Sequence, residues 1–150
     1  MSAQSDPPVR FQQLGRSILA VLAGIAVGIV LSLGTDWGVR VIGLVPARNE
    51  PWPNQLLLLA AVYRSMYGVI SGYVIARLAP NRPMGHSLFA GALGMLVSTL
   101  GAIAAWSTTV GQHWYGLALV LTALPMAWIG ARFRVMQFRI ETTAGPANAK

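Results

Sequence analysis

Arg64 stands in the middle of an apolar segment and is the first candidate for chemistry in this sequence. An arginine stays ionised and offers five N–H donors, so it can bind a carboxylate, a phosphate or another acceptor-rich group. Its candidate partners are Ser32, Asp36, Tyr63 and Tyr67. Three interpretations are open: a buried ion pair with Asp36 that fixes helix register, a polar site for a solute, or a side chain that extends to the outer membrane interface. The ion pair is favoured, because one arginine with one nearby acid is sufficient to form it.

Other residue types that support catalysis or metal binding are sparse. The chain has no cysteine, which excludes disulfides, thiolate metal sites and cysteine nucleophiles. His86 and His113 are expected on opposite sides of the membrane and cannot share a metal. No pair of carboxylates suited to acid–base catalysis and no nucleotide-binding or hydrolase motif occurs. We therefore predict that the protein is not an enzyme and has no metal and no cofactor.

The composition is that of a membrane protein. Hydrophobic residues make up 55% of the 150 residues and charged residues only 10%, whereas soluble domains carry about 25% charged residues. The net charge is +7, but the basic residues lie in short clusters beside apolar segments. That placement favours an anionic membrane surface over nucleic acid. The expected partner is the lipid bilayer, with no nucleic acid.

Four apolar segments are each long enough to cross a bilayer as a helix. The sequence predicts an all-α, integral membrane, antiparallel four-helix transmembrane bundle. The transmembrane domain is expected over 14–135, with a disordered N-terminus over 1–13 and a cytoplasmic tail over 136–150. The connection 36–54 either forms a short interfacial helix or extends the first span. The predicted spans are 17–35, 55–76, 87–106 and 114–131.

The arginines predict which way these spans point. Seven of them lie before the first span, between the second and third, or after the fourth, against two on the other side. The positive-inside rule then places both termini and the 77–86 loop in the cytoplasm. The high Arg, Ala and Gly content suggests a bacterial source. We therefore expect a multi-pass protein of the bacterial inner membrane.

Small residues recur at every fourth position in the first two spans, and residues at that spacing share one helix face. The predicted antiparallel register pairs Gly24 with Gly72, Gly28 with Gly68 and Ser32 with Arg64, so that the two helices approach closely. Substituting leucine for Gly28 or Gly68 should then destabilise the fold far more than changes at lipid-facing leucines. The two series are Ala20, Gly24, Gly28, Ser32, Asp36 and Ala60, Arg64, Gly68, Gly72, Ala76.

A set of short elements carries a family likeness: Tyr63-Arg64, Gly68, Gly72-Tyr73, Ala76-Arg77-Leu78-Ala79-Pro80 and Pro83-Met84, with Gly34-Thr35-Asp36 after the first span and Trp114-Tyr115 opening the last. In these elements the sequence resembles a group of small four-helix bacterial membrane proteins without a known activity. The likeness extends over most of residues 15–132 and implies the fold rather than a function. Small multidrug transporters fit less well, because they need a glutamate in the first membrane helix and the first span has none.

Two functions remain open at this point. The favoured one is a non-enzymatic structural or accessory subunit that binds a membrane-protein partner. The alternative is a small homo-oligomeric transporter or channel, such as a homodimer, that uses Arg64 to conduct an anion or small polar solute. A cavity that reaches Arg64 would favour the transporter, and an Arg64 sealed by Asp36 or carbonyl groups would favour the accessory subunit.

Overall fold

The computed structural model describes residues 7–45, 52–80, 82–107 and 112–144, and side chains only within 12–142. The described residues form four long α-helices and no strand. The predicted all-helical, four-helix bundle is confirmed. In chain order the helices are α1 (Pro7–Val41), α2 (Asn54–Leu78), α3 (Pro83–Ala104) and α4 (His113–Ala144).

Local sequence explains where these helices stop. α1 ends at a glycine: Gly43 adopts φ +75°, and the Leu44 amide donates to the Val39 carbonyl at 3.2 Å. This six-to-one hydrogen bond over a left-handed residue is a Schellman motif, which favours glycine. α2 ends at Leu78 because Ala79 precedes a proline and is therefore extended, at φ −67° and ψ 125°.

Two helices run further than the predicted spans. α1 begins at Pro7 and continues to Val41, so the predicted disordered N-terminus is helical from Pro7. Of the two alternatives for residues 36–54, the structure shows that the chain extends the first span as far as Val41. α4 likewise continues through the predicted tail to Ala144. Polarity marks where a segment leaves lipid, whereas a helix ends only where glycine, proline or a cap interrupts its hydrogen bonds.

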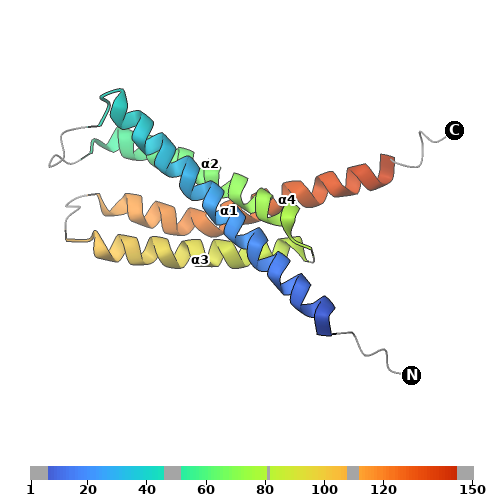
Figure 1. Cartoon of the computed structure of the whole chain (residues 1–150). Coiled ribbons are helices and arrows are strands. Elements are labelled where there is room, and N and C mark those ends of the chain that lie inside the picture. The colour runs from blue at the N-terminus through green and yellow to red at the C-terminus, as the bar shows by residue number, and fades with distance from the viewer. Residues whose placement is uncertain (1–6, 46–51, 81, 108–111, 145–150) are drawn as a thin grey trace, which may run out of the picture.

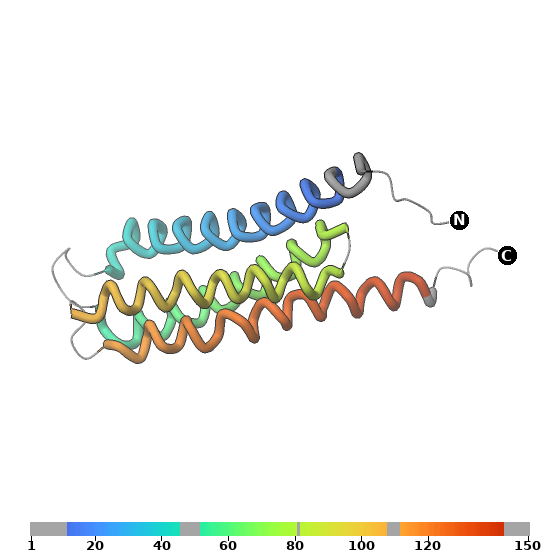
Figure 2. Tube along the Cα trace, turned by 90° about the horizontal axis from the view of Figure 1, so that it is seen from below, coloured from blue at the N-terminus to red at the C-terminus, as the bar shows by residue number. Residues whose placement is uncertain are grey.

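The chain runs up and down through the bundle, so that α1 begins and α4 ends at the same end (Figure 1). We call the other end the tryptophan end, because Trp52, Trp106 and Trp114 lie there. Helices α2, α3 and α4 pack together, and α1 lies on one side of them (Figure 2). Within the described residues α1 packs along α2, touches α3 at few points and makes no close backbone contact with α4.

The most extensive contact joins α2 to α4, two helices that run parallel. Glycines allow it: a Cβ added to Gly72 would lie 2.5 Å from the Ala127 carbonyl oxygen. A Cβ on Gly130 would lie 2.7 Å from the Tyr73 amide nitrogen and overlap the Val69 carbonyl. Close backbone approach of this kind favours helix association in lipid, where the hydrophobic effect does not act between helices.

This arrangement corrects the predicted register of α1 and α2. Gly72 faces α4 rather than Gly24, and a Cβ on Gly68 would meet Met126 of α4. Gly24 instead packs against Ile75, and Gly28 lies beside Ser71. The residues of α2 that contact α1, Ser71 and Ile75, therefore each lie one position before a member of the predicted small-residue series. The series was assigned to the wrong neighbour, because small residues allow close approach without specifying which helix approaches.

All four helices are long and apolar enough to cross a membrane. Large apolar side chains such as Leu19, Val30 and Leu121 are exposed around the bundle. Such a surface is costly in water and favourable in lipid. The structure therefore indicates a multi-pass membrane protein, and the candidate spans are Gln12–Val41, Asn54–Leu78, Pro83–Ala104 and His113–Thr142.

Candidate functional site

The structure brings Arg64 and Asp36 into direct contact. The Arg64 Nη2 donates to the Asp36 Oδ2 at 2.5 Å, and the Tyr63 hydroxyl donates to the other carboxylate oxygen. Asp36 belongs to α1, whereas Tyr63 and Arg64 are neighbours on α2. Both oxygens of the carboxylate are thus satisfied, as a carboxylate held away from water requires. The ion pair joins α1 to the rest of the bundle.

Further hydrogen bonds continue this contact along α1 and α2. The hydroxyls of Thr35 and Tyr67 lie 2.7 Å apart, and the Ser71 hydroxyl donates to the Gly24 carbonyl at 2.6 Å. Tyr67 was expected beside Arg64 but bonds to Thr35 of α1 instead. Each bond satisfies polar groups that would otherwise be costly in hydrocarbon. Polar contacts and the close approach at Gly24 therefore hold α1 on α2, whereas Gly72 and Gly130 allow the contact between α2 and α4.

Arg64 is only partly covered by its partners. Its side chain remains 34% exposed, against 25% for Asp36. Its Nε is buried and has no hydrogen-bond partner among the described residues. Because a guanidinium has five N–H donors and Asp36 accepts from Nη2, donors remain available. The pair is electrically neutral but has an excess of donors.

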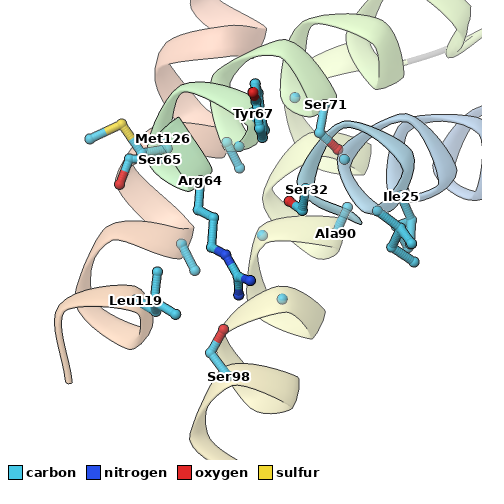
Figure 3. A pocket seen from close by; sticks show the side chains of 18 of the residues that line it. Ile25, Ser32, Arg64, Ser65, Tyr67, Ser71, Ala90, Ser98, Leu119 and Met126 are labelled. Atoms are coloured by element: carbon cyan, nitrogen blue, oxygen red, sulfur yellow. The ribbon is translucent and has the colours of Figure 1, made fainter. Parts of the chain in front are cut away.

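A cavity of about 490 Å³ lies beside this pair and has walls from all four helices. Figure 3 shows Arg64 extending from α2 into this space, with the Ser98 hydroxyl of α3 directed toward its guanidinium. Ser32 of α1 also lines this cavity. The volume falls within the roughly 300–1,000 Å³ of typical small-molecule sites. Arg64 is therefore not sealed inside packed protein.

A second cavity of about 330 Å³ extends from Arg64 to the tryptophan end. Its far wall includes Trp106, Gln112 and His113, and the rings of Trp106 and His113 stack at 4.0 Å. The Nδ1 of His113 is buried without a partner in the described part of the chain. Four residues belong to both cavities, which therefore meet at one level of the bundle: Arg64, Val97, Ser98 and Leu119.

Most hydroxyls around the larger cavity already take part in hydrogen bonds within the protein. Ser65 donates to the Ala61 carbonyl at 2.7 Å and Thr122 to the Ala118 carbonyl at 2.7 Å. By contrast, the structure shows no hydrogen bond from Ser32 or Ser98 to another described residue. The groups free to bind a solute are therefore Ser32, Ser98 and the remaining N–H donors of Arg64.

The residues predicted from the sequence fall into two sets. Asp36, Tyr63 and Arg64 are joined by hydrogen bonds, whereas Tyr67 bonds to Thr35 and Ser32 lines the larger cavity without a hydrogen bond to another described residue. Sequence reasoning missed Ser98, although the third span carries the same four-residue spacing of small residues. That series, like those of the first two spans, faces the interior and lines the two cavities: Ala90, Gly94, Ser98 and Ala102.

Comparison with known proteins adds no family to this description. No protein-family model, curated protein or solved structure matches the chain. The resemblance to small four-helix bacterial membrane proteins stays a prediction. Any function must rest on the chemistry around Arg64.

Proposed function

We propose that this chain is a small, non-enzymatic protein of the bacterial inner membrane that binds an anion or small polar solute at Arg64 and acts as a transporter or channel. The observation that carries the proposal is the meeting of two cavities at Arg64. One lies among all four helices and the other extends to the tryptophan end. Together they provide a route to a charged group inside the bundle.

The energetics of an intramembrane arginine support this proposal. A charged side chain at the centre of a membrane helix costs about 2.5–3.5 kcal/mol on insertion scales. Asp36 offsets part of that cost, but an ion pair alone does not require the cavity beside it. The Ser98 hydroxyl is directed toward the guanidinium, and Ser32 lines the same cavity. This combination is suited to a solute rich in acceptors.

The packing of α1 supports a homo-oligomeric transporter. α1 is held mainly by α2, so the side of the bundle between α1 and α3 lacks close helix contact. A bundle of four helices has little interior of its own, and a second copy would enclose the route more fully. A homodimer is therefore part of the proposal.

The proposed orientation places both termini in the cytoplasm. It is supported by the arginines near the end of the bundle where α1 begins and α4 ends, including Arg16, Arg77 and Arg134. Because the chain has no cysteine, single cysteines report topology directly. In intact cells an impermeant maleimide should label Leu44→Cys and not Thr142→Cys. The reverse pattern would refute the orientation.

A binding and flux experiment tests the transport proposal. The purified chain would be melted in detergent with acetate, phosphate or a neutral polyol, and the same solutes would be followed in proteoliposomes. Wild type should show stabilisation and flux for at least one of them. The matched variant is Arg64→Gln with Asp36→Asn, which removes both charges together and leaves no unpaired ion. Equal binding and flux by this variant would overturn the proposal.

An accessory subunit is the second candidate, and the ion pair favours it. Asp36 satisfies Arg64 in the way that a structural pair would, with Tyr63 completing its hydrogen bonds. On this proposal the exposed side between α1 and α3 contacts another membrane protein. Purification in mild detergent should then recover a stable partner in fixed proportion, and no solute should stabilise the isolated chain.

A further inference from the structure

The larger cavity changes character along its length. Near Arg64 it has polar side chains, whereas its far part is lined by apolar and small residues such as Ile75, Ala90 and Gly91. Arg64 and Ile75 are eleven residues apart on α2, which corresponds to about 16 Å along the helix. The cavity is therefore long, with donors at one end and hydrocarbon walls over the rest.

The same cavity opens sideways, toward the surface that faces lipid. Three apolar residues of its wall are also strongly exposed: Ile29 at 53%, Leu33 at 62% and Val97 at 67%. The first two belong to α1 and the third to α3, so the opening lies between these helices. Between α1 and α3 the described residues make few close backbone contacts. A molecule dissolved in the bilayer could enter there without crossing a polar surface.

We infer that the ligand of this cavity is a single-chain amphiphile, with an acceptor-rich, anionic head at Arg64 and an alkyl chain extending toward Ile75. This inference rests on the proposed function and narrows its solute class. The guanidinium and Ser98 recognise the head through hydrogen bonds. The apolar walls take up the chain, and the gap between α1 and α3 admits it from the bilayer.

The depth of Arg64 distinguishes such a ligand from an ordinary bilayer lipid. Arg64 lies eight residues after Leu56 near the start of α2, or about 12 Å along the helix into a hydrocarbon core about 30 Å thick. The head of a phospholipid stays at the interface. A molecule with one chain and a small carboxylate or phosphate head can move inward, because the ion pair and hydroxyls replace its water.

Radiolabelled dodecanoate is a suitable probe, and one glycine offers a clean way to block the chain. Gly94 lines the cavity, and a Cβ there would have no heavy atom within 4 Å, so the Gly94→Leu side chain starts in open space and adds volume at the cavity wall. Its matched control is Gly34→Leu, which is also open but lies outside both cavities. We expect Gly94→Leu to weaken binding to the full chain in detergent about tenfold or more, since displacing about two methylenes suffices. Gly34→Leu should bind like wild type, and equal binding by Gly94→Leu would overturn the inference.

The head is tested through the ion pair. Asp36→Asn should bind dodecanoate more tightly, because it removes a carboxylate that competes for Arg64. The double variant Arg64→Gln with Asp36→Asn should bind it roughly tenfold more weakly or worse. Dodecyl phosphate is the second probe, and a phospholipid should not compete with either. If both variants bind dodecanoate with the same affinity as wild type, the assignment of the head to Arg64 is refuted.

Acetate and inorganic phosphate separate this inference from the function on which it rests. If they bind as tightly as dodecanoate and depend on Arg64, the amphiphile is refuted while the solute site stands. If no anion of any length depends on Arg64, the proposed function fails as well. A preference for dodecanoate that Gly94→Leu abolishes supports both.

Discussion

Gly72→Ala offers a direct test of how the bundle is held together. Gly72 lies where α2 meets α4, and an added Cβ would lie 2.5 Å from the Ala127 carbonyl oxygen and 2.9 Å from its Cα. These are backbone atoms, so no side-chain rotation can relieve the contact. The Gly72 carbonyl also accepts a hydrogen bond of 2.9 Å from the buried Ser87. A displacement of α2 would therefore disturb α3 as well.

The size of the effect follows from these distances. Ordinary contact begins near 3.4 Å, so the 2.5 Å contact requires the two backbones to separate by up to 0.9 Å. Overpacking a well-packed interface costs roughly 1–3 kcal/mol. Gly94→Ala, on the wall of the same cavity but in open space, adds a methyl group without this cost. Because both changes gain the same helix propensity, the difference between the variants is the steric cost, or roughly a 5- to 150-fold change in the folded-to-unfolded ratio.

The free energy of unfolding can be measured for both variants by titrating SDS into non-ionic detergent micelles and following helicity and tryptophan fluorescence. We expect Gly72→Ala to unfold at a lower SDS fraction than wild type, and Gly94→Ala at the same fraction or higher. If Gly72→Ala is as stable as Gly94→Ala, then α2 and α4 do not approach through this glycine, and the packing described above is wrong.

Three further predictions concern α1. Asp36→Asn should lower the free energy of unfolding by about 1–3 kcal/mol, because it leaves Arg64 without its counter-ion, and adding Arg64→Gln should recover part of the loss in the same titration. Thr35→Val and Tyr67→Phe remove opposite sides of one hydrogen bond, so each should cost about 1 kcal/mol and the double variant little more than either alone. Gly28→Ala should be tolerated within about 0.5 kcal/mol in thermal melts, since its Cβ would meet only the Ser71 side chain at 3.7 Å. Loss of the fold in Gly28→Ala would instead restore the register predicted from the sequence.

Much of the fold could be predicted because its causes are local. Apolar segments long enough to cross hydrocarbon must be helical there, since lipid offers no partner for free backbone groups. Prolines and glycines then mark several ends, as at Gly43 and at Ala79 before Pro80. The helices nevertheless run beyond the predicted spans at both termini of the chain. Hydropathy measures where lipid ends and carries no information on where hydrogen bonding along the helix stops.

The candidate site was predictable in part for a similar reason. A lone arginine in an apolar span needs an acceptor, and Asp36 was the carboxylate within reach, so the sequence pointed to their contact. Ser98 and the cavities could not be found this way, because their relation to Arg64 depends on how α3 packs against α2. The small-residue spacing in the third span indicates a face for close packing but does not say whether that face meets a helix or encloses a cavity.

The sequence by itself determined four apolar helices, their up-and-down order and the need of Arg64 for a counter-ion. These three features follow from the lipid that surrounds the helices and from the chemistry of single residues. Only the tertiary structure decided that Gly68 and Gly72 of α2 pack against α4 rather than α1 and that two cavities meet at Arg64. It also decided that hydrogen bonds and the close contact at Gly24 hold α1 in place. Small residues permit close approach to any neighbour, and the choice among neighbours depends on the fit of whole helix surfaces.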